Sequence, residues 1–365
     1  MTAIETDVAS LARLVSHYRR RVALAIGLGV CSCAVLAIIA LCRGAVPIPA
    51  QRVAAILWQS IFGWASIAQD RETLVVISIR LPRVLLGLEI GAALAVSGAL
   101  MQGLFRNPLA DPGLIGVSSG AAFAAAGAIV LDDRLFGSTV VKLGFAILPA
   151  SAFCGGLAAT LIIYSIATRR GRTSMATMLL AGIALGALAG AATGLLSYVS
   201  DDKQLRDLTF WSLGTLNGAT WSKVAAVALI ILPLLSAVPF LGRRLNALSF
   251  GEAEAFYLGL RVEQIKTATI ILVALAVGVS VASAGVIGFI GIVAPHIIRL
   301  AVGADHRVLI PLSAFFGAAL LVGADTLART LVAPAELPVG ILTALLGAPF
   351  FLWLLLRRAS GSSVS

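Results

Sequence analysis

Long apolar runs recur along almost the whole chain, and they restrict its fold more than any other feature of the sequence. Each run is close to the ~20 residues that an α-helix needs to cross the hydrocarbon of a bilayer. Inside a bilayer the backbone must satisfy its own hydrogen bonds, which a helix does within one segment. We therefore predict an all-α integral membrane protein with about ten transmembrane helices. The predicted spans are Val22–Leu41, Val84–Phe105, Leu114–Leu131, Leu143–Ile166, Met178–Val199, Val224–Leu241, Thr267–Val281, Ile287–Val302, Leu309–Ala328 and Val339–Leu356.

The composition argues against a water-soluble fold. Hydrophobic residues make up 59% of the 365 residues and charged residues 12%, whereas soluble domains carry about 25% charged residues. A net charge of +10 would suggest a nucleic-acid partner in a soluble protein. In a chain of membrane spans the same basic residues flank the spans and set their orientation. We therefore expect a lipid environment and no nucleic acid.

The basic clusters predict the topology. An even number of spans places both termini on one side, and the arginine clusters at 169–172, 243–244 and 357–358 fall on that side. By the positive-inside rule this side is cytoplasmic. We predict a cytoplasmic amphipathic segment at 1–21, a ten-helix transmembrane domain at 22–358 and a cytoplasmic tail at 359–365.

Nucleotide chemistry is not expected in this chain. A phosphate-binding loop needs a lysine that follows glycine, and none of the four lysines does so: Lys142, Lys203, Lys223 and Lys266. If ATP drives the protein, a partner must bind it. The four cysteines lie in apolar segments, where cysteine packs as a small hydrophobe, so we expect no metal site.

One serine raises an enzymatic alternative. Gly116, Ser118 and Gly120 match the Gly-x-Ser-x-Gly pattern of hydrolases. That pattern works between a strand and a helix, whereas here it lies in a predicted membrane helix. We therefore expect no catalytic residue, and we keep a membrane enzyme that uses Ser118 as an alternative.

A polar loop interrupts the spans at 241–266. Charged and large apolar residues alternate through it, so it is too polar to span and too patterned for a linker. We predict two short amphipathic helices, broken at Gly259. They either face lipid headgroups or are gripped by a cytoplasmic subunit.

Three arginines lie on the other side, against the positive-inside trend. Arg80 and Arg83 precede the second span, and Arg329 ends the ninth. They are either interfacial residues or a docking surface, because the arginine fork suits the carboxylates of a partner. Asp325 stands four residues before Arg329, so these two side chains can pair on one helix face.

Other segments carry weaker signals. The stretches at 46–67 and 200–223 are too polar to span, and we expect a short helix in each outside the membrane. Glycines repeat every four residues on one face of the fifth span, at Gly182, Gly186, Gly190 and Gly194. Such a row either lets helices approach closely or forms a smooth wall beside a bulky substrate.

Several stretches of the sequence together are highly specific for one protein family. They include Arg80-Leu-Pro-Arg83 and the segments 98–120, 249–260, 285–300, 303–311, 323–329 and 336–351. They resemble the permease family of type II ABC importers, which carry haem, ferric siderophores and cobalamin. The resemblance extends from about Arg80 to Arg358. It implies a bacterial inner-membrane homodimer with two cytoplasmic ATPase subunits that bind ATP, and a periplasmic binding protein that delivers the substrate.

The resemblance also implies roles for single residues. Arg80, Arg83 and Arg329 correspond to arginines that dock the binding protein. Ser174 to Thr177 corresponds to the cytoplasmic gate, although Ser174-Met-Ala-Thr177 departs from the Thr-Ser pair of the cobalamin permease. The residues that correspond to the ATPase-coupling segment are Leu248, Gly251, Glu252, Ala255, Gly259 and Leu260.

The substrate follows from a narrower resemblance. The segments 178–202 and 205–221 are similar to the haem-importing branch. We expect haem to pass as substrate along the glycine wall without a permanent cofactor, with Arg206 as a partner for its propionates. Ferric siderophore and cobalamin importers are the alternatives, and a secondary transporter driven by an ion gradient is another.

Overall fold

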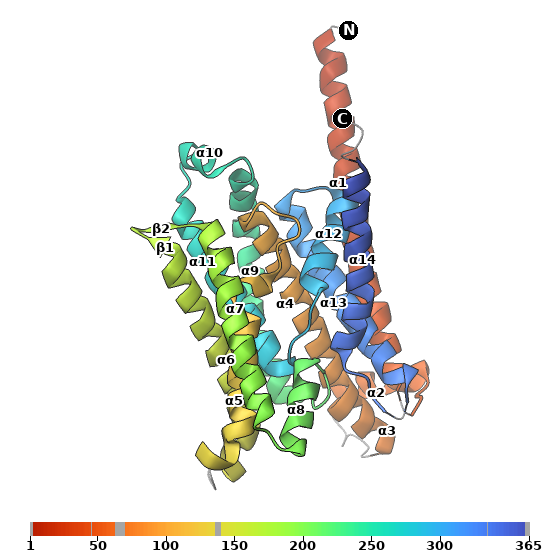
Figure 1. Cartoon of the computed structure of the whole chain (residues 1–365). Coiled ribbons are helices and arrows are strands. Elements are labelled where there is room, and N and C mark those ends of the chain that lie inside the picture. Colours follow the sequence, from red (N-terminus) through yellow and green to blue (C-terminus); the bar gives the residue numbers. More distant parts are fainter. Residues whose placement is uncertain (1–2, 45, 63–69, 136–139, 334, 362–365) are drawn as a thin grey trace.

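Helices make up most of this computed structural model, which describes residues 3–44, 46–62, 70–135, 140–333 and 335–361. The longer helices run roughly side by side, and short elements cap both ends of the bundle (Figure 1). The longer helices are α1 (Ala3–Cys42), α4 (Leu81–Leu104), α5 (Val117–Leu135), α6 (Val140–Ala167), α7 (Met175–Tyr198), α9 (Trp221–Leu248), α11 (Val262–Ala284), α12 (Ile290–Val302), α13 (His306–Leu331) and α14 (Val339–Gly361).

The short elements gather at two opposite ends. Helix α10 (Glu252–Tyr257) and the antiparallel pair β1 (Thr168–Arg169) and β2 (Arg172–Thr173) lie at one end, which we call the α10 end (Figure 1). The opposite end, which we call the α8 end, carries α2 (Ala50–Phe62), α3 (Arg71–Leu74), the π-helical turn η1 (Val75–Arg80) and α8 (Asp202–Ser212). The 3₁₀ turn η2 (Pro112–Ile115) follows α4 and packs against α5, α6, α7 and α11.

The predicted fold class is confirmed. Among the described residues, seven helices are long and apolar enough to cross a membrane, and shorter apolar helices occur at 117–131, 290–302 and 339–354. These helices fall at the positions of the predicted spans. Helix α1 begins and α14 ends at the α10 end (Figure 1), so the two ends of the chain lie on one side of the bundle as predicted.

Helix α4 is the centre of the bundle. Its apolar span is 83% buried inside the chain, and it packs against α9, α11, α12 and α13. Glycine makes two of these contacts possible. A Cβ at Gly98 would overlap the carbonyl oxygen of Gly291 on α12, and a Cβ at Gly91 would overlap that of Gly317 on α13. Small residues at such crossings allow backbones to touch in lipid.

Local signals explain where several helices begin. Asp201 and Gln204 form a capping box at the start of α8, with each side chain accepting from the other residue's backbone N–H. Thr220 caps α9 and Asp305 caps α13 in the same way, by accepting a backbone N–H. These bonds satisfy donors that the first turn of a helix leaves free.

The predicted helices outside the spans are present. Helix α2 lies within the stretch 46–67, of which residues 63–67 fall outside the described residues, and α8 lies within the stretch 200–223. The predicted segment 1–21 does not form a separate element, because α1 continues from Ala3 into the first span. The predicted tail 359–365 begins inside α14, and residues 362–365 fall outside the described residues.

The prediction of two short helices at 241–266 was wrong. Helix α9 continues to Leu248 because Leu241, Leu245 and Leu248 extend its buried face, with exposed fractions of 4%, 0% and 1%. Helix α11 already begins at Val262, which leaves α10 as the single short helix of this loop. Its limits are set by Gly251 and Gly259, whose φ angles of +138° and +81° favour glycine.

Candidate functional site

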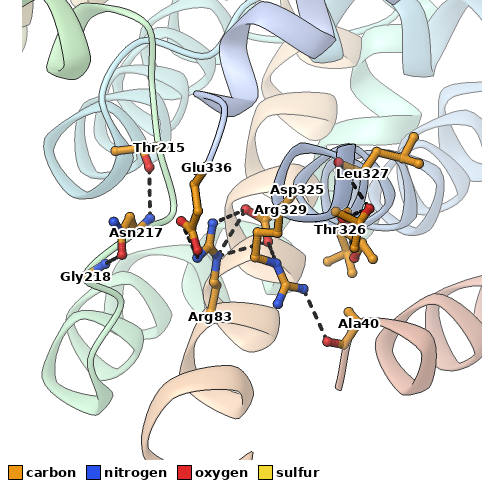
Figure 2. Close-up of polar contacts among 12 residues, drawn as sticks. Ala40, Arg83, Thr215, Asn217, Gly218, Asp325, Thr326, Leu327, Arg329 and Glu336 are labelled. Carbon is orange, nitrogen blue, oxygen red and sulfur yellow. Dashed lines mark hydrogen bonds and ion pairs between the residues drawn. The ribbon is translucent and has the colours of Figure 1, made fainter. Parts of the chain in front are cut away.

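Four charged side chains meet near the α8 end, and we call them the arginine cluster: Arg83, Asp325, Arg329 and Glu336. The Arg83 guanidinium donates to Asp325 through Nε (3.1 Å) and Nη2 (2.9 Å), and through Nη1 to Glu336 (2.9 Å). Arg329 also pairs with Asp325, with 3.2 Å between Nε and Oδ2. Figure 2 shows Arg83 between Glu336 and Asp325, with Arg329 reaching on to the carbonyl of Ala40. The predicted pairing of Asp325 with Arg329 is confirmed.

Burial separates the members of this cluster. The side chains of Arg83, Asp325 and Arg329 are 8%, 5% and 7% exposed, whereas that of Glu336 is 38% exposed. Removing one partner from a buried pair leaves an uncompensated charge, which is strongly unfavourable. Asp325 therefore holds two buried cations at once, and Glu336 covers the cluster from the solvent-facing side.

Arg80 is held differently. Its guanidinium donates to the backbone carbonyls of Leu41 (2.6 Å) and Val46. Arg80, Arg83 and Arg329, the predicted docking residues, are each less than a tenth exposed and bonded within the chain. Their docking role itself stays a prediction.

A second set of polar groups meets at the α10 end, and we call it the lysine cluster: Lys266, Glu252, Glu263 and Thr173. Lys266 Nζ donates to Glu252 Oε2 (2.7 Å), Glu263 Oε1 (3.0 Å) and the carbonyl of Thr173 (2.9 Å). Glu263 Oε2 in turn accepts the backbone N–H of Thr173 at 2.9 Å. Strand β2, α10 and α11 are thereby joined at one ammonium group.

The lysine is enclosed although its partners are not. Lys266 is 2% exposed, and Glu252 and Glu263 are 45% and 35% exposed. A lysine is almost never buried to this degree unless it is paired. Sequence reasoning could have found the pair with Glu263, which lies three residues before Lys266 on the same helix. Nothing in the spacing of the sequence indicated the contacts with Glu252 and Thr173.

The predicted coupling residues divide into framework and surface. Leu248 and Ala255 are buried in the core, Leu260 packs partly against it, and Gly251 and Gly259 set the turns around α10. Glu252 belongs to the lysine cluster. The large exposed side chains of this loop are Phe250, Phe256, Tyr257 and Leu258.

Sequence reasoning predicted that this loop faces lipid headgroups or a cytoplasmic subunit, but it did not select these four exposed residues as a site. The mixture of charged and large apolar residues was the available signal. Next to it, a groove of about 610 Å³ lies between the β1–β2 hairpin and α10, lined among others by Arg170, Arg172, Phe256 and Arg261.

The predicted gate lies at the start of α7. Ser174 caps this helix by accepting the backbone N–H of Thr177 at 3.2 Å, and the Thr177 hydroxyl donates to the same oxygen at 3.0 Å. Both residues are exposed, and they directly follow Thr173 of the lysine cluster. The structure therefore brings the predicted gate and the predicted coupling loop together at the α10 end.

The glycine row of α7 serves two purposes. A Cβ at Gly182 would overlap the carbonyl oxygen of Leu114, so this glycine is a packing contact. Around Gly190 and Gly194 there is open space, and both are exposed. Arg206 is exposed on α8, so a role beside the pathway stays a prediction.

One polar anchor holds the bundle beside α10. Asp305 lies between α12 and α13, where a hydrogen bond from Arg307 lowers the pKa of its carboxyl to about 2, with further bonds outweighing the effect of burial. Asn246 near the end of α9 donates to Asp305 at 2.6 Å and accepts the backbone N–H of His306 at 2.8 Å. The end of α9 is therefore tied to the start of α13.

An apolar cavity of about 460 Å³ lies between α1, α4, α9 and α13. Glu89 is its acidic member, and Cys33 and Phe315 are among its apolar lining. Cys33 Sγ also donates to the carbonyl of Phe315 at 3.1 Å. This cavity belongs to the side of the bundle that carries α1, away from α7.

Comparisons with known proteins agree on a family. The family model described as the FecCD transport family matches residues 32–357. The hemin transport system permease protein of Yersinia pestis is 51% identical over 295 residues, which cover 81% of this chain and 87% of the relative. The cobalamin import system permease protein of Halobacterium salinarum is 45% identical over 289 residues, 79% of this chain and 75% of the relative.

A solved structure has the same architecture. It is described as an inward-facing conformation of a metal-chelate type ABC transporter, and it is 32% identical to this chain. The match covers 92% of this chain and 99% of the other, with a TM-score of 0.78.

Proposed function

The chain belongs to the FecCD transport family and is a multi-pass permease subunit of an ABC importer, and we propose that it moves haem from periplasm to cytoplasm. The observation that carries the choice of haem is the 51% identity with the hemin permease, against 45% with the cobalamin permease. The haem-like segments at 178–202 and 205–221 point the same way.

The proposal requires partners. This chain has no lysine placed to bind nucleotide phosphates, so two ATPase subunits supply ATP hydrolysis. Their contact is the exposed surface of Phe250, Phe256, Tyr257 and Leu258, which presents apolar side chains at the α10 end. That end is the cytoplasmic one in the topology that the basic clusters predict.

A second copy of the chain completes the pathway. Only 11% of the apolar span of α7 is buried inside this chain, and Gly190 and Gly194 face open space. Such a face allows close approach of another helix or of a flat, bulky substrate. The two copies then enclose a pathway whose outer mouth includes Arg206.

The binding protein docks at the α8 end. Glu336 is the exposed carboxylate of the arginine cluster, with its oxygen 2.9 Å from Arg83 Nη1. A carboxylate of the binding protein takes the place of Glu336 on this fork, which is the geometry that arginine offers to carboxylates. Docking thereby requires no new buried charge, because one carboxylate replaces another.

Transport occurs by alternating access. The permease has outward-open and inward-open states, and ATP binding at the partner shifts the population between them. A ligand or partner shifts such an equilibrium only by its different affinity for the two states. The ATPase binds the two states with different affinity through its contact with the surface around α10.

The test is ATP-driven uptake into liposomes that hold this chain with its ATPase partner. Binding protein loaded with haem is added outside, and haem inside is measured with ATP and with a non-hydrolysable analogue. We expect accumulation that needs both ATP and binding protein. Transport of a ferric siderophore or of cobalamin, without haem uptake, would keep the permease and discard haem as its substrate.

A further inference from the structure

Three elements, β2, α10 and α11, meet at the buried ammonium group of Lys266. Lys266 on α11 contacts Glu252 on α10 and the carbonyl of Thr173 on β2, at 2.7 and 2.9 Å. Its third acceptor is Glu263 on its own helix at 3.0 Å. The three donors of a lysine are thus matched by three acceptors from three directions.

Strand β2 and helix α10 are bonded to α11 by different numbers of contacts in this cluster. Glu263 holds Thr173 twice, because it accepts the Thr173 N–H directly and also binds the lysine that binds the Thr173 carbonyl. Strand β2 is therefore firmly joined to α11. Helix α10 contributes a single carboxylate, Glu252, which is 45% exposed and which water can solvate when it leaves.

The surroundings confine any movement to the loop that carries α10. Asn246 ties the end of α9 to Asp305 and His306. Gly251 and Gly259 flank α10 with positive φ angles. A force applied to the exposed face of α10 reaches the rest of the chain through the buried Ala255 and through the side-chain contact of Glu252 with Lys266.

The other side of the cluster leads to the start of α7. Thr173 precedes Ser174, whose side chain caps α7 and whose backbone N–H donates to the carbonyl of Ala167 at 3.0 Å. The Thr173 hydroxyl also lies 3.0 Å from that of Thr168. Displacement of Thr173 therefore moves both the end of α6 and the first turn of α7.

We propose that Lys266 is a positioning residue that transmits movement of α10 to the start of α7, through Glu252 on one side and Thr173 on the other. The inference rests on the proposed function, in which α10 meets the ATPase and residues 174–177 form the gate. The exposed Glu252 is the joint that engages and releases. The bonds among Lys266, Glu263 and Thr173 persist, so these three residues move together.

The experiment compares two glutamates of the same helix. Glu252→Gln removes the charge that pairs with Lys266, and Glu254→Gln makes the same change at an exposed position with no bond to the lysine. Both are assembled with the ATPase partner in liposomes. The readouts are substrate transported per ATP hydrolysed, and the labelling of Ala176→Cys by a water-soluble thiol reagent with and without ATP, in a chain without its native cysteines.

We expect Glu252→Gln to hydrolyse ATP while transport per ATP falls about fivefold or more, the range of ordinary coupling energies between sites. The response of Ala176→Cys labelling to ATP should shrink in parallel. Glu254→Gln should behave as the unaltered chain. Lys266→Arg, which keeps the charge, should retain more coupling than Lys266→Met.

The outcomes separate this inference from the proposed function. If transport per ATP and the labelling response are the same in Glu252→Gln and Glu254→Gln, Lys266 only stabilises the fold and the inference is overturned. A labelling response that is absent even in the unaltered chain overturns the assignment of the gate. Failure of haem uptake with a normal labelling response contradicts only the choice of substrate.

Discussion

The arginine cluster and the lysine cluster lie at opposite ends of the bundle and solve the same electrostatic problem in different ways. Each encloses a cation between two carboxylates from different segments. In the arginine cluster the central carboxylate, Asp325, is itself buried, at 5% exposed. In the lysine cluster both carboxylates are at least a third exposed.

The difference follows from what each cluster joins. Asp325 and Arg83 connect α13 to α4, the buried centre of the bundle, and arginine's planar fork fixes their relative geometry. Lys266 is a point charge that connects a long helix to two short elements. We conclude that the first cluster fixes helices in place, whereas the second can release a partner to water.

The largest expected effect breaks the fixed cluster. Asp325→Asn leaves Arg83 and Arg329 buried with Glu336 as the remaining carboxylate, so we expect the free energy of unfolding to fall by about 3–5 kcal/mol. Thermal unfolding in detergent is the measurement, with Asp202→Asn on exposed α8 as the matched control. Equal stability of the two variants would contradict the interpretation that Asp325 stabilises the fold by pairing with Arg83 and Arg329.

A smaller effect is expected at the other cluster, although its cation is the more enclosed. Lys266→Met leaves Glu252 and Glu263 without their cation, but both carboxylates reach water. We expect a loss of about 1–3 kcal/mol, the cost of bonds to a charged group, measured by the same thermal unfolding. A loss as large as that of Asp325→Asn would remove the distinction between a fixed and a releasable cluster.

Glu336→Gln tests whether the exposed edge of the arginine cluster is replaceable. Glu336 is 38% exposed, so the free energy of unfolding should change by no more than about 1 kcal/mol. The affinity of the binding protein should rise, because its carboxylate no longer competes with Glu336 for Arg83. Affinity is measured by titration of the reconstituted complex, and a decrease would show that Glu336 is not displaced on docking.

The smallest effect on stability is expected at Arg206, which belongs to neither cluster. Arg206→Ala removes an exposed side chain on α8, so the unfolding temperature should stay unchanged. Haem uptake in liposomes should fall if the guanidinium meets the propionates. In the unaltered chain, haem uptake should then be lower at high salt than at low salt, because salt screens this exposed contact. Unchanged uptake would end the role of Arg206 in the pathway.

Sequence reasoning located the spans because hydrophobic length is a local property that the bilayer enforces directly. It also found the pair of Asp325 and Arg329, which are four residues apart on one helix. It missed the partner of Arg83, because Asp325 lies 242 residues away and no local pattern links the two. The arginines therefore looked available to an external partner, whereas the fold uses them internally.

The loop between α9 and α11 shows a different limit. Its alternating charged and apolar residues predicted two short helices where the structure has one, because the leucines before Ser249 belong to the buried face of α9. Whether an apolar residue continues a helix or begins a new one depends on what covers it, which the sequence does not state. Glu252 was selected, and its contact with Lys266 emerged only from the fold.

The two glycines that flank α10 also make this helix a segment whose exposed residues can be exchanged without changing its surroundings. Residues 252–257 lie between Gly251 and Gly259, and their polar link inward is the acid at position 252. Exchange of the exposed aromatic residues of this segment, Phe256 and Tyr257, would redraw the surface that we propose to meet the ATPase, while the glycines, Ala255 and Lys266 keep their places. On this proposal, specificity for the motor subunit and integrity of the membrane core are encoded by different residues, and each is free to diverge without the other.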